Sequence, residues 1–148
     1  MKKLRAIVLG AGYRGRAYAE YAKEHPDQLE IVGVADPEQA EVIPAPQYWT
    51  DWRECLEAHP EADIVMVTMP DALHHDPAIM ALEAGYHLLL EKPISPTAQE
   101  CREVIDCAIR NRRLVIVGHV LRYTAYFAHV KALIDSGELG DVVSISHQ

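Results

Sequence analysis

Six residues near the N-terminus limit the fold of this chain more than any other part of its sequence. The apolar run Leu4–Leu9 leads directly into Gly10-Ala11-Gly12-Tyr13-Arg14-Gly15, which has the G-x-G-x-x-G spacing. Between a strand and a helix, the first glycine permits a tight turn and the second lets the backbone approach a pyrophosphate. The third lets the helix pack closely on the strand. The start of that helix offers free N–H groups and a positive dipole end to phosphates. Alone the pattern is weak, because an ordinary glycine turn can carry it.

An acidic residue downstream turns this pattern into a prediction of dinucleotide binding. Asp36 ends the second apolar run, Leu29–Ala35, about 20 residues after the glycines, where a carboxylate accepts the ribose hydroxyls of the cofactor. A carboxylate there repels a 2′-phosphate, and no Arg or Lys lies between Asp36 and Ala45. We therefore predict NAD, with NADP disfavoured. A turn role before Pro37 is the alternative for Asp36, and Arg14 either contacts the pyrophosphate or is solvated.

Apolar runs alternate with helix-like stretches along the rest of the chain. The runs are continuously apolar, which is typical of parallel strands covered on both faces. The pattern predicts an α/β fold with a doubly wound, mainly parallel sheet and helices on both faces, the Rossmann fold. The predicted strands are Leu4–Leu9, Leu29–Ala35, Gln47–Trp49, Ile64–Thr68, Tyr86–Leu90 and Leu114–Val117. The predicted helices are Tyr13–Lys23, a short one capped by Asp51, one from Asp71 or Asp76 to Gly85, one starting at Ser95 or Thr97 with Cys101, Val104, Ile105, Ala108 and Ile109 on its apolar face, and one from Thr124 to Ser136.

The last segment has a different pattern. In Val142–Ser146, apolar and polar residues alternate, as in an antiparallel strand with one wet face. We expect a dinucleotide-binding domain over residues 1–122. Residues 123–148 would form a linking helix and the first strand of a substrate domain that this chain does not contain. Such an unpaired strand would be disordered, folded back or paired with another copy, so a homo-oligomer is left open.

Composition excludes several classes of protein. The net charge of −8 argues against a nucleic-acid partner, which requires a basic surface. No apolar run is long enough to span a membrane, and the N-terminus has no signal-peptide pattern. The three cysteines have no metal-binding spacing, so we predict reduced thiols, a cytoplasmic location and no metal site.

Three segments that follow predicted strands resemble one known family. They are Thr68-Met69-Pro70-Asp71-Ala72-Leu73-His74, Glu91-Lys92-Pro93 and Gly118-His119-Val120-Leu121-Arg122-Tyr123. In this order they are similar to the Gfo/Idh/MocA oxidoreductases, and the resemblance covers nearly the whole chain. Asp71 stands where the family commonly has Asn, and Thr124-Ala125 stand where it often has a proline. These departures concern the fine shape of the nicotinamide pocket.

The resemblance implies roles for residues at the carboxyl ends of the strands. Lys92 would be the catalytic lysine, hydrogen-bonding the substrate hydroxyl and stabilising charge on its oxygen, with a solvated surface lysine as the alternative. Glu91 would contact the nicotinamide ribose or form an ion pair with Lys92. The remaining predicted cofactor contacts are Thr68, Met69, Pro70 and His74, which would line the adenine-ribose and nicotinamide side.

The function implied by the resemblance is hydride transfer. The whole protein would move a hydride between nicotinamide and the hydroxyl carbon of a sugar, inositol or related polyol. We expect this chain alone to bind cofactor with little or no turnover, because the family's catalytic histidine and most substrate contacts lie in the second domain. The main alternative is a non-catalytic NAD-sensing module. Binding of CoA or a nucleotide sugar is a third, which Asp36 disfavours.

Overall fold

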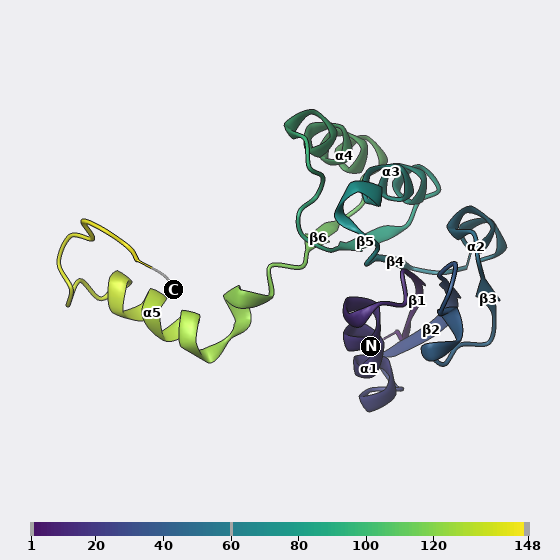
Figure 1. Cartoon of the computed structure of the whole chain (residues 1–148), viewed down its shortest axis with the longest axis horizontal. Coiled ribbons are helices and arrows are strands. Elements are labelled where there is room, and N and C mark those ends of the chain that lie inside the picture. The colour runs from purple at the N-terminus through teal and green to yellow at the C-terminus, as the bar shows by residue number, and fades with distance from the viewer. Residues whose placement is uncertain (1, 60, 147–148) are drawn as a thin grey trace. The chain divides into compact units, whose positions relative to one another are not determined.

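A computed structural model describes residues 2–59 and 61–146 of the chain (Figure 1). The chain divides into two compact units, of which the first ends at Gly118 and the second begins at His119. Each unit is described by itself. The predicted domain boundary after residue 122 stays a prediction.

The first unit is built on a parallel sheet of six strands in the order β3-β2-β1-β4-β5-β6. The order reverses between β1 and β4, the point at which doubly wound sheets bind ligands at their carboxyl edge. The predicted fold class is confirmed. The strands are β1 Leu4–Leu9, β2 Leu29–Ala35, β3 Tyr48–Trp49, β4 Ile64–Val67, β5 His87–Leu90 and β6 Val115–Val117.

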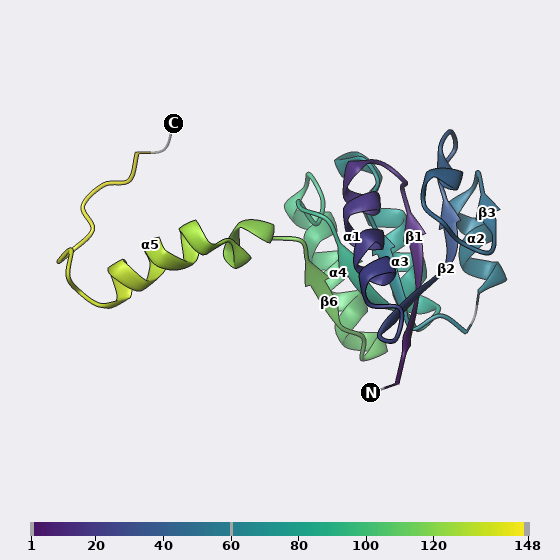
Figure 2. The ribbon, with the colours of Figure 1, turned by 90° about the horizontal axis from the view of Figure 1, so that it is seen from below.

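Helices cover both faces of this sheet (Figure 2). One core layer joins the sheet to α2, α3 and α4, and the opposite layer joins it to α1 and the 3-10 helix η1. Within β1, Ala6, Ile7, Val8 and Leu9 are fully buried because both of its faces are covered. The helices of this unit are α1 Tyr13–Glu24, η1 Ala40–Val42, α2 Trp52–Ala58, η2 Asp71–Leu73, α3 His75–Glu83 and α4 Ala98–Asn111.

Side-chain caps mark two helix starts. The Asp51 carboxylate accepts the N–H of Arg53 at 2.7 Å and begins α2, as predicted. Of the two candidates for α4, Thr97 is the cap, and its hydroxyl accepts the N–H of Glu100 at 3.2 Å. Each cap satisfies an N–H that the helix itself leaves without a partner, which is worth about 1 kcal/mol.

The predicted apolar face of α4 was partly wrong. Val104 and Ala108 are buried, together with Cys107, whereas Ile105 is 46% exposed and Ile109 is 69% exposed. The buried residues of α4 face α3, and the two helices pack side by side (Figure 1). A hydrophobic pattern gives the period of a helix, but the position of a neighbouring helix decides which side of a wide apolar face is covered.

The second unit contains the 3-10 helix η3, Val120–Tyr123, and α5, Ala125–Asp135. The residues predicted to face inward on α5, Phe127, Val130, Leu133 and Ile134, are half-buried. The segment Val142–Ser146 forms no strand in this chain, and Val143 is 94% exposed, so its role as the first strand of a substrate domain stays a prediction. A strand exists through hydrogen bonds to a neighbour, and no described residue pairs with this segment.

None of the helices in the described residues is both long enough and apolar enough to cross a membrane.

Candidate cofactor-binding site

The turn between β1 and α1 can be built only with glycine at two positions. Gly10 has a φ of +98°, and a Cβ there would lie 2.8 Å from the backbone carbonyl of Thr68. A Cβ on Gly15 would lie 2.1 Å from the Gly10 oxygen. These contacts bring the start of α1 directly against the ends of β1 and β4. The first and third glycines therefore act as the motif predicts.

The middle glycine faces open space. A Cβ on Gly12 would meet no atom within 4 Å, so nothing in the described chain prevents a ligand from approaching this backbone. Gly12 is the N-cap of α1, and no side chain caps this helix start. The first N–H groups of α1 therefore stay available, at the positive end of the helix dipole. This arrangement fits the pyrophosphate of a dinucleotide.

Asp36 is held in place by the turns around it. One carboxylate oxygen accepts the N–H groups of Glu38 and Gln39, both at 3.0 Å, and the other accepts the N–H of Ala11 at 2.8 Å. The last bond ties the end of β2 to the glycine turn. The carboxylate is half-buried, and the oxygen that accepts the Ala11 N–H keeps a second lone pair free for a ribose hydroxyl. Its negative charge at this position disfavours a 2′-phosphate.

Thr68 follows β4 and points its side chain back to the glycine turn. Its hydroxyl is 2.6 Å from the Gly10 oxygen and 3.1 Å from the Leu9 oxygen. The Thr68 side chain is buried, so its hydroxyl stabilises the glycine turn and is not exposed to a ligand. The next two predicted contacts are more open, since Met69 is half-buried and Pro70 is exposed.

His74 joins the loops that follow β4 and β5. Its Nδ1 lies 2.7 Å from the Pro93 oxygen, and its Nε2 lies 2.8 Å from the Met69 oxygen. Carbonyl oxygens only accept hydrogen bonds, so a ring N–H is the donor to either oxygen. The ring is fully buried. His74 therefore positions the two loops, and its ring has no surface to offer a ligand.

Glu91 is a buried carboxylate at the end of β5, with 5% of the residue exposed. The Tyr18 hydroxyl donates to its Oε1, and the N–H of Lys92 donates to its Oε2 at 3.1 Å. The Nε of Arg14 lies 3.7 Å from Oε1. Burial, and then the hydrogen bond to Glu91, raise the pKa of Tyr18 to about 12. The ion pair of Glu91 is thus formed with Arg14 and not with the ammonium of Lys92.

Lys92 is exposed, and its ammonium forms no hydrogen bond or ion pair with any described residue. Its backbone N–H is held by Glu91, and the following Pro93 oxygen is held by His74. The base of the side chain is therefore anchored while its charged end stays free. The structure therefore holds this lysine through its backbone.

Two residues of this network carried no predicted role of their own. Tyr18 lies within the predicted helix Tyr13–Lys23 and Gly118 within one of the three motifs, without any further role. A tyrosine on the inward face of a helix is itself a signal, because a buried hydroxyl usually has a hydrogen-bond partner. The identity of that partner depends on where β5 ends.

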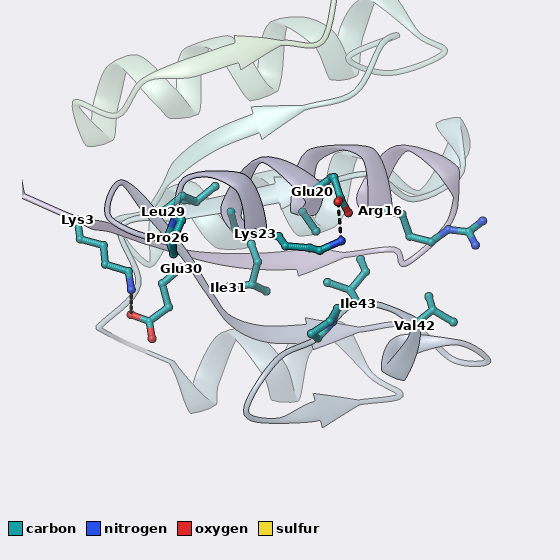
Figure 3. A pocket seen from close by; sticks show the side chains of 13 residues that line it. Lys3, Arg16, Glu20, Lys23, Pro26, Leu29, Glu30, Ile31, Val42 and Ile43 are labelled. Atoms are coloured by element: carbon teal, nitrogen blue, oxygen red, sulfur yellow. Dashed lines mark hydrogen bonds and ion pairs between the residues drawn. The ribbon is translucent and has the colours of Figure 1, made fainter.

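The chain has another hollow outside this site, between α1 and the region of β2 and η1 (Figure 3). None of the predicted site residues lines it. Lys23 pairs with Glu20 at 2.7 Å, and Lys3 pairs with Glu30 at 3.6 Å. Among residues 2–59 and 61–146, no cluster of three His, Cys, Asp or Glu side chains could hold a metal ion.

Comparison with known proteins identifies the family. The family model GFO_IDH_MocA, described as an oxidoreductase family with an NAD-binding Rossmann fold, matches residues 4–119. An uncharacterized oxidoreductase of Streptococcus pneumoniae is 34% identical over 139 residues, which are 92% of this chain and 37% of that protein. An inositol 2-dehydrogenase of Salmonella typhimurium is 29% identical over 151 residues, covering 96% of this chain and 44% of that protein.

A solved structure shares the fold. The WlbA dehydrogenase of Chromobacterium violaceum, in complex with NADH and UDP-GlcNAcA, matches with a TM-score of 0.85 and 25% identity. The match covers 95% of this chain and 42% of that one. The chain thus spans less than half the length of these relatives. The matched family binds NAD, so the predicted cofactor is confirmed. This chain belongs to the Gfo/Idh/MocA family of oxidoreductases and contains its NAD-binding Rossmann fold.

Proposed function

We propose that the whole protein is an NAD-dependent dehydrogenase that acts on a sugar, inositol or related polyol. It would transfer a hydride between C4 of nicotinamide and a hydroxyl-bearing carbon. One relative is an inositol 2-dehydrogenase, and a structural neighbour is a dehydrogenase in complex with a nucleotide sugar. The observation that carries the proposal is the meeting of a phosphate-binding turn, a fixed Asp36 carboxylate and the unpaired Lys92 ammonium at one edge of the sheet.

The adenosine half of the cofactor would be bound mainly by the backbone. The N–H groups at the start of α1 would hold the pyrophosphate beside Gly12, with Tyr13 and Arg14 on the first turn. Asp36 would accept the hydroxyls of the adenosine ribose. This acceptor role requires no movement, because three backbone N–H groups already orient the carboxylate.

The nicotinamide half would lie over the ends of β4 and β5. Glu91 would accept a hydroxyl of the second ribose, and Thr68, Met69 and Pro70 would line the ring. Bound NAD supplies the carbon that accepts or gives up the hydride. During oxidation, the substrate carbon would lose a hydride to NAD, and its hydroxyl would lose a proton to a base outside this chain, the role that the resemblance gives to the catalytic histidine of the second domain. The Lys92 ammonium would hydrogen-bond that oxygen, lower its pKa and stabilise the developing negative charge.

We expect the 148-residue chain to bind cofactor with little or no turnover.

Its three cysteines are free thiols, which supports a cytoplasmic protein. A substrate domain, and any homo-oligomer, would belong to the whole protein.

Calorimetric titration with NADH and NADPH tests the cofactor part of the proposal. We expect NADH to bind more tightly than NADPH, and Asp36→Ala to lower NADH affinity at least about tenfold, as for loss of a hydrogen bond to a charged group. Asp106→Ala, which alters an exposed carboxylate on α4, is the matched control and should change nothing. An NADH affinity of Asp36→Ala equal to that of Asp106→Ala would contradict the role of Asp36.

The catalytic part is tested in the full-length protein. Lys92→Ala should lower kcat strongly and leave NADH affinity within about twofold, because the ammonium acts on the substrate oxygen. Lys3→Ala removes an exposed ammonium far along the chain and is the control. An active Lys92→Ala variant would exclude the catalytic role. An unmodified protein that binds NADH but oxidises no polyol would favour an NAD-sensing module.

A further inference from the structure

We propose that Tyr18 is a positioning residue for the nicotinamide half of the cofactor, acting through the carboxylate of Glu91. This inference rests on the proposed function, in which Glu91 accepts a hydroxyl of the nicotinamide ribose. Tyr18 lies on α1 and Glu91 at the end of β5, 73 positions apart in sequence. Their hydrogen bond joins the phosphate-binding helix to the segment that carries Lys92.

The bond from Tyr18 completes the set of donors around a buried charge. Oε1 of Glu91 receives the phenol, and Oε2 receives the backbone N–H of Lys92 at 3.1 Å. With one donor on each oxygen, the carboxylate plane is fixed. A buried carboxylate that lacks a donor is unfavourable and turns toward other partners. Tyr18 therefore determines where the remaining lone pairs of Glu91 point.

The end of β6 closes over this pair and leaves room for no side chain. A Cβ on Gly118 would lie 2.6 Å from the Tyr18 hydroxyl and 2.8 Å from Oε1 of Glu91. The N–H of Gly118 donates to the Leu90 oxygen at 2.8 Å, so the strand cannot easily move away. Three separate elements, α1, β5 and β6, thus converge on one phenol–carboxylate contact.

Only the hydroxyl of Tyr18 belongs to this network. The ring packs against the core layer formed by β1, β2 and α1, as an ordinary apolar side chain does. Phenylalanine would keep that packing and remove the donor. The phenol also stays protonated at any working pH, because its pKa is raised to about 12. Tyr18 is therefore a permanent donor to Glu91.

Tyr18→Phe separates this role from a general role in folding. Calorimetry on the 148-residue chain compares NADH with ADP, which has the adenosine and the pyrophosphate but no nicotinamide riboside. We expect Tyr18→Phe to weaken NADH about tenfold, the effect of losing a hydrogen bond to a charged group, and to leave ADP within about twofold. Tyr21→Phe is the control on the same helix, since its hydroxyl bonds Gln28 at 2.8 Å in an exposed position.

A second variant disturbs the same Tyr18–Glu91 contact by a substitution at the end of β6. Gly118→Ala should push the phenol and the carboxylate apart and produce the same selective loss of NADH affinity. Equal loss of NADH and ADP in Tyr18→Phe would mean that the whole site has loosened, and unchanged NADH affinity would mean that the bond positions nothing. Either result overturns the inference while leaving the proposed function intact. If the unmodified chain bound ADP but not NADH, the proposed function would fail, and this inference with it.

Discussion

Replacing His74 by leucine tests whether the bridge between the two strand-end loops stabilises the fold. The ring is fully buried, with its nitrogens 2.7 Å from the Pro93 oxygen and 2.8 Å from the Met69 oxygen. Leucine has a similar volume, so the substitution leaves little cavity. Its main effect is to remove the ring N–H donor that faces two part-buried carbonyl groups.

The expected loss follows from these two groups. A buried polar group left without a partner costs about 1–3 kcal/mol, and because these two carbonyls are only part-buried we expect that amount for both together as the loss in the free energy of unfolding. A domain of this size has a total of about 5–15 kcal/mol. His74→Leu should therefore leave a folded but clearly weakened protein. His74→Gln, whose amide donates to one of the two carbonyls, should recover about half of the loss.

Urea unfolding followed by circular dichroism measures the effect. With an m-value of about 2 kcal/mol/M, the midpoint should fall by about 0.5–1.5 M in His74→Leu. His75→Leu is the matched control at the next position. It removes hydrogen bonds to the Asp76 and Glu103 carboxylates, both open to solvent, which are worth less than about 1 kcal/mol. A His74→Leu midpoint equal to that of His75→Leu would refute the bridge as a source of stability.

Three further outcomes follow from the same geometry. Gly15→Ala should abolish NADH binding and lower the unfolding midpoint in urea, because its Cβ would lie 2.1 Å from the Gly10 oxygen. The raised pKa of Tyr18, about 12, means that its contribution to stability is complete below pH 10 and is lost between pH 10 and pH 12. Ultraviolet titration should accordingly show late ionisation of Tyr18 and of Tyr86, whose pKa burial also raises, and Tyr18→Phe should remove the Tyr18 part of that signal. Burial also raises the pKa of the Cys55 thiol to about 12, so Ellman's reagent should leave Cys55 unmodified until urea unfolds the chain, whereas half-buried Cys101 should react in the folded protein.

The glycine turn of the candidate site was predictable because its constraints are local. Gly10 and Gly15 are required by backbone contacts within a single strand–turn–helix unit. Asp36 lies at the end of the next strand, where parallel pairing places it beside the same turn. Spacing along the sequence therefore carries nearly all the necessary information. The parallel sheet with helices on both faces follows from the alternation of apolar runs and helices in the same way.

Other features depend on contacts that no local pattern contains. Val142–Ser146 has the alternation of a strand, but pairing requires a partner, and none of the described residues provides one. His74 was expected to line the ligand side, yet its ring faces two carbonyls, one of them 19 positions away. Sequence alone cannot place the Pro93 oxygen, since that oxygen depends on where β5 ends beside β4.

The two halves of the site should therefore differ in how they respond to substitution. At the phosphate end the backbone itself forms the cradle, so only residues that change its path, such as Gly10 and Gly15, matter there. At the nicotinamide end, side chains from separate elements hold one another, as Tyr18 holds Glu91. A change to one member of such a network alters the others, so its effects are not additive. Combining Tyr18→Phe with Gly118→Ala should consequently weaken NADH binding by less than the product of the two single effects. Two independent losses that multiply would mean that these residues act on the cofactor separately.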